Sequence, residues 1–140
     1  MNKSRLIVLG IAGAVILSIT QFPFAATMQT RADYAAALDR AHDAYGNARA
    51  LCAPLAGHEW DMCIVEAHAL EKRAKAAAEI SYKGTIQSRA DGRIANADAD
   101  LMVARVACDS RTGQARGICV KQAKATNVRL VADAGENYAN

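Results

Sequence analysis

Four cysteines are the residues of this chain whose type and spacing bear most directly on chemistry. Cys52 and Cys63 stand eleven positions apart, and so do Cys108 and Cys119. Paired cysteines form structural disulfides, hold a metal as thiolates, or exchange disulfides with a substrate. Metal sites and thiol-exchange sites favour short spacings such as C-x-x-C, which this chain lacks. The spacing of eleven therefore favours structural disulfides, with no redox catalysis and no metal.

The cysteine pairs belong to a longer repeat with a period of 56 residues. A shift of 56 positions places each cysteine of the first pair on one of the second, and it also pairs Arg49 with Arg105, Gly57 with Gly113, Ala67 with Ala123, Arg73 with Arg129 and Tyr82 with Tyr138. Such self-similarity indicates two copies of one supersecondary unit. Four cysteines allow three pairings, and the repeat favours Cys52–Cys63 and Cys108–Cys119.

Helix-forming residues fill the long segments that must position these cysteines. Proline occurs only at positions 23 and 54, and small or apolar residues recur every three or four positions over about 31–51, 60–82, 94–108 and 118–134. Cysteine ends one stripe and begins the next, so an antiparallel hairpin brings the two face to face. We expect an all-α fold of two disulfide-clamped antiparallel helical hairpins, residues 27–83 and 93–140, with a linker at 84–92. The hairpins either pack as a four-helix bundle, which we favour, or stay separate.

The N-terminus has the layout of an export signal. Lys3 and Arg5 precede an apolar run from Leu6 to Ile19, so residues 1–26 are expected to be a signal peptide, or a membrane anchor over 6–26 if uncleaved. The predicted location is the periplasm, with inner-membrane anchoring in the second case, and the membrane is contacted only through this segment. Two of the 17 basic residues and none of the 14 acidic ones lie in 1–26. The exported part is then nearly neutral, which argues against nucleic-acid binding.

The segment between the first cysteine pair holds the other candidate site. His58 lies beside Glu59 and Asp61, but no paired ligand spacing of a metal site is present, and the second loop has no histidine. We predict neither a metal nor a cofactor here. Trp60, the only tryptophan, either packs over the disulfide or anchors a partner, so His58 and Trp60 form a candidate interaction loop.

No arrangement typical of catalysis is visible in the sequence. His42 has Asp39 and Asp43 as near neighbours, and His68 has Glu71 three positions on, which indicates solvated ion pairs on helices. No Ser-His-Asp order, nucleophile elbow or phosphate loop is present. We therefore expect no catalytic residues and no enzymatic activity.

Several of these segments resemble a repeat common in small exported proteins of proteobacteria that are loosely labelled TolA-like cell-envelope biogenesis proteins. The resemblance covers about residues 41–134 and rests on Ile94–Asp100, Cys108, Asp109, Gly113, Cys119–Ala125 and the inter-repeat segment Tyr82–Thr85. Loops of that family usually carry an aspartate before the second cysteine. The first loop keeps it as Asp61, whereas residues 113–117 of the second loop lack it, so a partner that reads both loops is not implied. The resemblance supplies no catalytic residue.

Together these observations predict a non-enzymatic exported protein of the cell envelope, either structural or a protein-interaction module with an envelope protein as its partner. The alternative is a small periplasmic stress protein that binds a metal or ligand through the His58–Trp60 loop. A thiol-disulfide enzyme is the least favoured class, because its cysteines would stand closer together.

Overall fold

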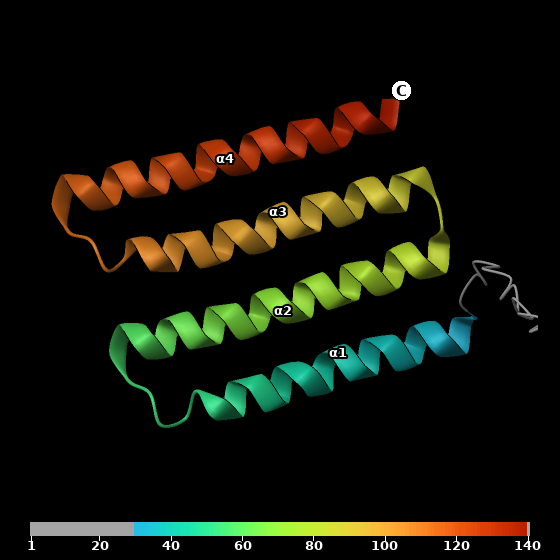
Figure 1. Ribbon diagram of the computed structural model, residues 1–140, viewed down its shortest axis with the longest axis horizontal. Helices are drawn as coiled ribbons and strands as arrows, with labels where there is room; N and C mark the ends of the chain where they lie inside the picture. Colours follow the sequence, from blue (N-terminus) through green and yellow to red (C-terminus); the bar gives the residue numbers. More distant parts are fainter. Residues whose placement is uncertain (1–29, 140) are drawn as a thin grey trace, which may run out of the picture.

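Four long helices lie side by side in a single layer (Figure 1). The computed structural model describes residues 30–139 and contains α1 (Arg31–Leu51), α2 (Gly57–Lys83), α3 (Ile86–Cys108) and α4 (Gly113–Ala139). Each helix runs antiparallel to the next, and each contacts only its neighbours in the chain. The all-α fold of two antiparallel hairpins is confirmed, and the hairpins pack together through α2 and α3. Within residues 30–139 the layer is open, since α1 and α4 do not meet. The predicted export segment, residues 1–26, lies outside the described residues.

The first helix matches its predicted bounds because its N-terminus carries a strong capping signal. The Thr30 hydroxyl accepts a hydrogen bond from the backbone N–H of Asp33 at 3.1 Å, and the Asp33 carboxylate accepts one from the Thr30 N–H at 3.1 Å. This reciprocal pair satisfies two backbone donors that have no partner inside the helix. The Thr30 hydroxyl also donates to the Asp33 carboxylate at 2.7 Å, and this hydrogen bond, together with the one from the Thr30 N–H, holds the pKa of Asp33 below its usual value.

Two predicted helix starts are wrong, since α2 begins at Gly57 and α4 at Gly113. Both glycines have a positive φ, 56° and 54°, a conformation that turns the chain directly into the helix and that other residues rarely adopt. His58 and Trp60 therefore lie in the first turn of α2 and not in a loop. At the other end α4 continues to Ala139, beyond the predicted end of this helix at about residue 134.

The predicted linker 84–92 is also wrong, because only Gly84 and Thr85 separate α2 from α3. Gly84 ends α2 in the left-handed conformation, with φ 62°, and its N–H donates to the Ile80 carbonyl at 2.9 Å. Thr85 then caps α3 through a reciprocal pair of hydrogen bonds with Ser88. A complete helix stop followed at once by a complete helix start leaves no residues for a flexible linker.

The core consists almost wholly of small side chains. Among residues 30–136 the largest fully buried side chains are Cys52, Cys108 and Ser88. Ten of the twelve buried hydrophobic residues in this range are alanine or valine: Ala41, Val65, Ala67, Ala69, Ala76, Ala78, Ala90, Ala97, Ala99 and Ala134. In the inner helix α2 they occupy two opposite sides, because residues 65, 69 and 76 share one side and residues 67 and 78 the other. An inner helix of a single layer packs against two neighbours, so it needs two small-residue stripes.

Candidate functional site

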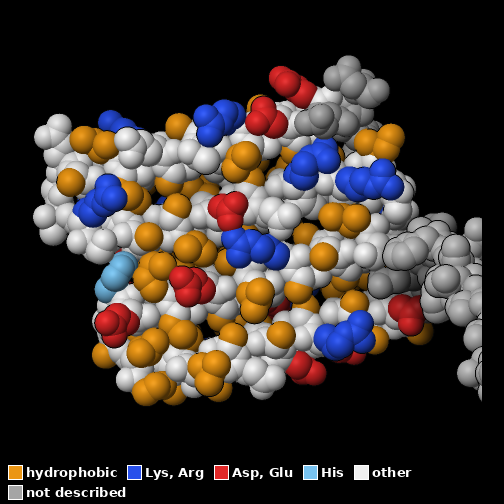
Figure 2. Space-filling model, in the orientation of Figure 1, with side chains coloured by type: hydrophobic (Ala, Val, Ile, Leu, Met, Phe, Trp, Pro, Cys, Tyr) orange, Lys and Arg blue, Asp and Glu red, His pale blue; other side chains and the backbone are white. Residues whose placement is uncertain are grey.

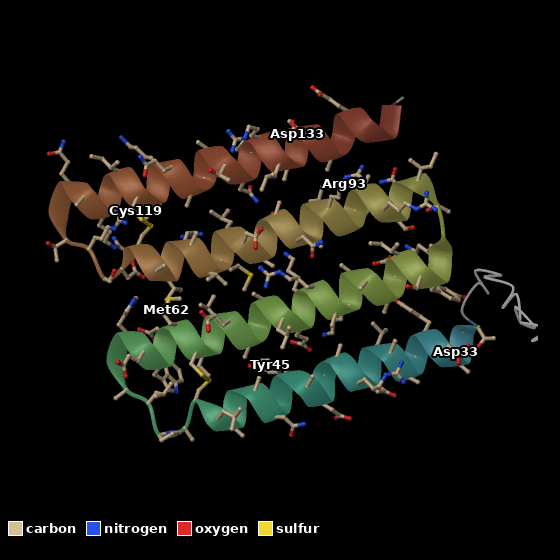
Figure 3. The ribbon with its side chains drawn as sticks, in the orientation of Figure 1. Asp33, Tyr45, Met62, Arg93, Cys119 and Asp133 are labelled. Carbon is tan, nitrogen blue, oxygen red and sulfur yellow. A yellow bond between two sulfur atoms is a disulfide. The ribbon has the colours of Figure 1, made fainter. Side chains whose placement is uncertain are left out.

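Two disulfides clamp the two hairpins at the same end of the layer. Cys52 bonds to Cys63 and Cys108 to Cys119, each with a Cα–Cα distance of 5.7 Å. Figure 3 shows both bonds at the end at which Met62 and Cys119 are labelled. The predicted pairing is confirmed. Disulfides of this structural kind are typical of proteins exported to an oxidising compartment. None of the helices formed by residues 31–139 is long and apolar enough to cross a membrane.

The connection between α1 and α2, which we call the first tip (residues 51–60), is apolar and exposed. Residues 53–56, with the sequence Ala-Pro-Leu-Ala, are all exposed. Leu51 is 77% exposed and Trp60 43% exposed, which is unusual for side chains of this size. Figure 2 shows hydrophobic side chains gathered over the end of this hairpin. No other part of residues 30–139 covers this apolar surface.

The connection between α3 and α4, which we call the second tip (residues 107–116), has the same turn but opposite polarity. Its residues 109–112, with the sequence Asp-Ser-Arg-Thr, are also all exposed. The Arg116 Nε donates to an Asp109 carboxylate oxygen at 2.7 Å, and the Ser110 hydroxyl donates to the Ala107 carbonyl at 2.9 Å. The fold therefore accepts a fully polar tip at this position.

The two predicted site residues of the first tip are placed differently from one another. His58 is exposed on the first turn of α2. Trp60 lines a hollow together with Asp61, Ile64 and His68 of the same helix. Among residues 30–139 no three His, Cys, Asp or Glu side chains come together in a way that could hold a metal ion.

The other two histidines pair across the first hairpin, and the partners we predicted for them are wrong. His42 Nδ1 lies 3.5 Å from a carboxylate oxygen of Glu71 on α2, and not against Asp39 or Asp43. His68 stacks on the ring of Tyr45, with centroids 4.4 Å apart, and its Nε2 lies 3.0 Å from the tyrosine hydroxyl oxygen. Packing of α1 on α2 creates these contacts, which neighbours along one helix do not reveal.

Glu71 also forms an ion pair with Lys75 of its own helix, at 2.7 Å. The hydrogen bond from Lys75 lowers the pKa of Glu71, and His42 adds to this effect, while partial burial opposes it. Glu71 thus accepts hydrogen bonds from His42 of α1 and from Lys75 of α2, and so links the two helices.

A groove lies between the two hairpins at the clamped end. Its floor is apolar, formed by Val65 of α2 with Met102 and Val106 of α3, and it extends to Val120 of α4. It comprises adjoining hollows of about 460 and 430 Å³ that share Val65, Val106 and Asp109. Near the two-residue turn, by contrast, Gly92 lies so close to Ile80 that a Cβ there would collide with it. The floor residues of this groove were not among our predicted sites.

Polar side chains tie the hairpins together along the same helices. Asp98 of α3 accepts from Lys72 of α2 at 3.2 Å and from the Asn127 side chain of α4 at 3.2 Å. Arg73 of α2 forms a second ion pair with Asp100 of α3. These contacts fix the position of one hairpin on the other, so the tips and the groove are held by a rigid frame.

Comparison of the chain with protein-family models, curated proteins and solved structures finds no match. The candidate sites are therefore the apolar first tip and the groove between the hairpins, both defined by their own geometry.

Proposed function

We propose that this protein is a non-enzymatic interaction module of the cell envelope, exported to the periplasm, that binds an envelope protein through its first tip. The observation that carries the proposal is the difference between the two tips. The repeat places residues 53–56 on residues 109–112, so the sequence Ala-Pro-Leu-Ala occupies the position of Asp-Ser-Arg-Thr. Both segments are exposed, and both precede a glycine with positive φ.

The fold itself gives no reason for an apolar first tip. The second tip makes the same connection with four polar residues, and the same disulfide clamps both hairpins. Apolar side chains held in water lose the free energy that burial would provide, about 25 cal/mol per Å² of apolar surface. Clusters of this kind on a small protein are typical of protein–protein contact sites. Leu51, Leu55 and Trp60 are the anchors that we assign to this contact.

The scaffold suits such a role. Each tip is closed by a disulfide at its base, so its backbone loses little conformational entropy when a partner binds. A metal- or ligand-binding role for His58 and Trp60 has no comparable support, because the described residues hold no cluster of metal ligands.

The experiment that tests this proposal is site-specific photo-crosslinking in cells, with the matched tip as its control. A photoreactive phenylalanine analogue replaces Leu55 in one strain and the equivalent Arg111 in another, both in the full chain with its export segment. We expect a discrete crosslinked protein from position 55, in the periplasmic fraction, and none from position 111. Equal crosslinking at both positions, or none at position 55, would contradict the proposal.

A further inference from the structure

Within the part of the chain that the structure describes, no second layer covers the groove face. Protein domains generally bury their apolar surfaces between two packed layers, whereas each helix here contacts only the helices beside it. Two larger apolar side chains of α3, Met102 and Val106, line the floor of the groove beside the buried Val65 of α2 and are not themselves fully buried. Met102 remains 36% exposed. A second layer on this face would bury them.

The two sides of the groove carry opposite charges. Asp61 of α2 lies on one side, and Arg105 of α3 and Arg116 of α4 line the part that extends toward α4. Arg116 is paired with Asp109 inside its own hairpin. Within residues 30–139 neither Asp61 nor Arg105 forms an ion pair.

Opposite charges on two sides of an apolar floor make a surface complementary to itself. Rotation of one copy by 180° about an axis along the groove places its acidic side over the basic side of the other copy, and the reverse contact forms at the same time. The apolar floors then face each other. A two-fold contact therefore pairs each acidic side with a basic side of the other copy and buries both apolar floors.

We propose that the groove face is the contact surface of a two-fold symmetric dimer, in which a second copy of this chain supplies the missing layer. Trp60 borders both the groove and the first tip, whereas Leu51 and Leu55 of the first tip do not line the groove, so variants of Leu55 and Met102 test the two proposals separately. The dimer presents two first tips, which would raise the avidity for a partner with two sites.

Side-by-side extension of the layer is the less favourable way to add a copy. The repeat places Asp39 and Asp43 of α1 on Ala95 and Ala99, and Lys121 of α4 on Val65. The outer sides of α1 and α4 thus carry charges at positions where the inner helices have apolar residues. End repeats of stacked helical proteins are capped in the same way.

Sedimentation equilibrium of the full exported chain tests the dimer. At about 100 µM we expect the mass of two chains for the natural sequence. Met102→Glu places a carboxylate on the apolar floor and should raise the dimer Kd at least about 100-fold. Leu55→Glu, the matched change at the first tip, should leave the dimer Kd unchanged while it abolishes the partner crosslink formed by a photoreactive residue placed at the exposed position 51. The dimer proposal is therefore tested by the Kd and the proposed function by the crosslink, and either can be refuted without the other.

A charge exchange provides the second test, in case Met102→Glu disturbs folding. Asp61→Arg should raise the dimer Kd about tenfold, and the double variant Asp61→Arg with Arg105→Glu should bring it back to within about threefold of the natural value. A natural chain that is monomeric at about 100 µM overturns the proposal, and the groove then belongs to a different protein. A dimer that tolerates both Met102→Glu and Asp61→Arg overturns it as well, because its interface lies elsewhere.

Discussion

Removal of either disulfide should lower the free energy of unfolding by about 3 kcal/mol. The loss should be the same for the first and the second hairpin. Both disulfides join residues eleven positions apart. Closing a ring of this size costs the unfolded chain about 9–10 cal/mol/K of entropy, which at 25 °C is about 3 kcal/mol. Alanine is the appropriate replacement, since Cys52 and Cys108 are buried among small side chains. The variants are Cys52→Ala with Cys63→Ala, and Cys108→Ala with Cys119→Ala.

The positions of the two disulfide rings also predict that the losses caused by removing the two disulfides add. The ring of the first hairpin ends at residue 63 and that of the second begins at residue 108, so the two rings share no residue. Changes at separate sites add, and the variant without any cysteine should lose about 6 kcal/mol. Small domains are stable by about 5–15 kcal/mol, so this variant should stand at the edge of unfolding.

Urea unfolding followed by far-ultraviolet circular dichroism measures these differences. The natural chain in the presence of reductant serves as a control and should unfold at the same urea concentration as the variant without cysteines. A loss below about 1 kcal/mol for either pair would refute the argument that the disulfides restrict the unfolded chain. A difference of more than about 1.5 kcal/mol between the pairs would show that native packing, and not ring size, sets the contribution.

Gly92→Leu should destabilise the protein by about 1–3 kcal/mol, because Gly92 is buried and the new side chain collides with that of Ile80. Gly46→Leu, whose Cβ meets no atom within 4 Å, should instead stabilise the protein by about 0.5–1 kcal/mol, and equal effects in thermal unfolding would contradict this distinction. Glu71→Gln should lower the Tm at neutral pH and leave it unchanged at about pH 2. The hydrogen bond from Lys75 lowers the pKa of Glu71, so the stability contributed by this carboxylate is present above its unfolded pKa of about 4.3 and is lost as the pH falls through its folded pKa. A Tm difference between Glu71→Gln and the natural chain that persists at about pH 2 would show that the ionised carboxylate is not the cause.

Much of the helical organisation could be predicted because its causes are local. The hairpins follow from cysteines at the ends of periodic stripes, and the bounds of α1 follow from Thr30 and Asp33. Helix starts were missed at Gly57 and Gly113, because polar residues after a glycine look like a continuing loop. The linker was missed for a related reason, since the glycine-containing segment looks like a loop, whereas Gly84 ends α2 and Thr85 with Ser88 caps the start of α3.

The candidate sites were predictable only in part. Trp60 stood out by its type, and its exposure beside Leu51 is a property of the folded tip. The groove was not predicted, because the periodicity was interpreted as one buried stripe per helix. Val65, Met102 and Val106 lie on the second stripe of α2 and α3, which exists only because each inner helix has two neighbours. The sequence did contain one signal for the groove: these three positions carry large apolar residues, whereas most other positions on the stripes carry alanine.

The sequence by itself determined the number of helices, their pairing into two hairpins and the partner of each cysteine, because periodicity, capping and a repeat act over short distances along the chain. Only the tertiary structure decided that the hairpins form one open layer, that His42 and His68 pair across helices, and that a groove remains between the clamped ends. The physical reason is that these features depend on which sides of the helices meet, and small side chains permit several such arrangements. The two-residue turn at Gly84 and Thr85, the contact of Gly92 with Ile80, and the ion pairs of Asp98 and Asp100 select the one observed.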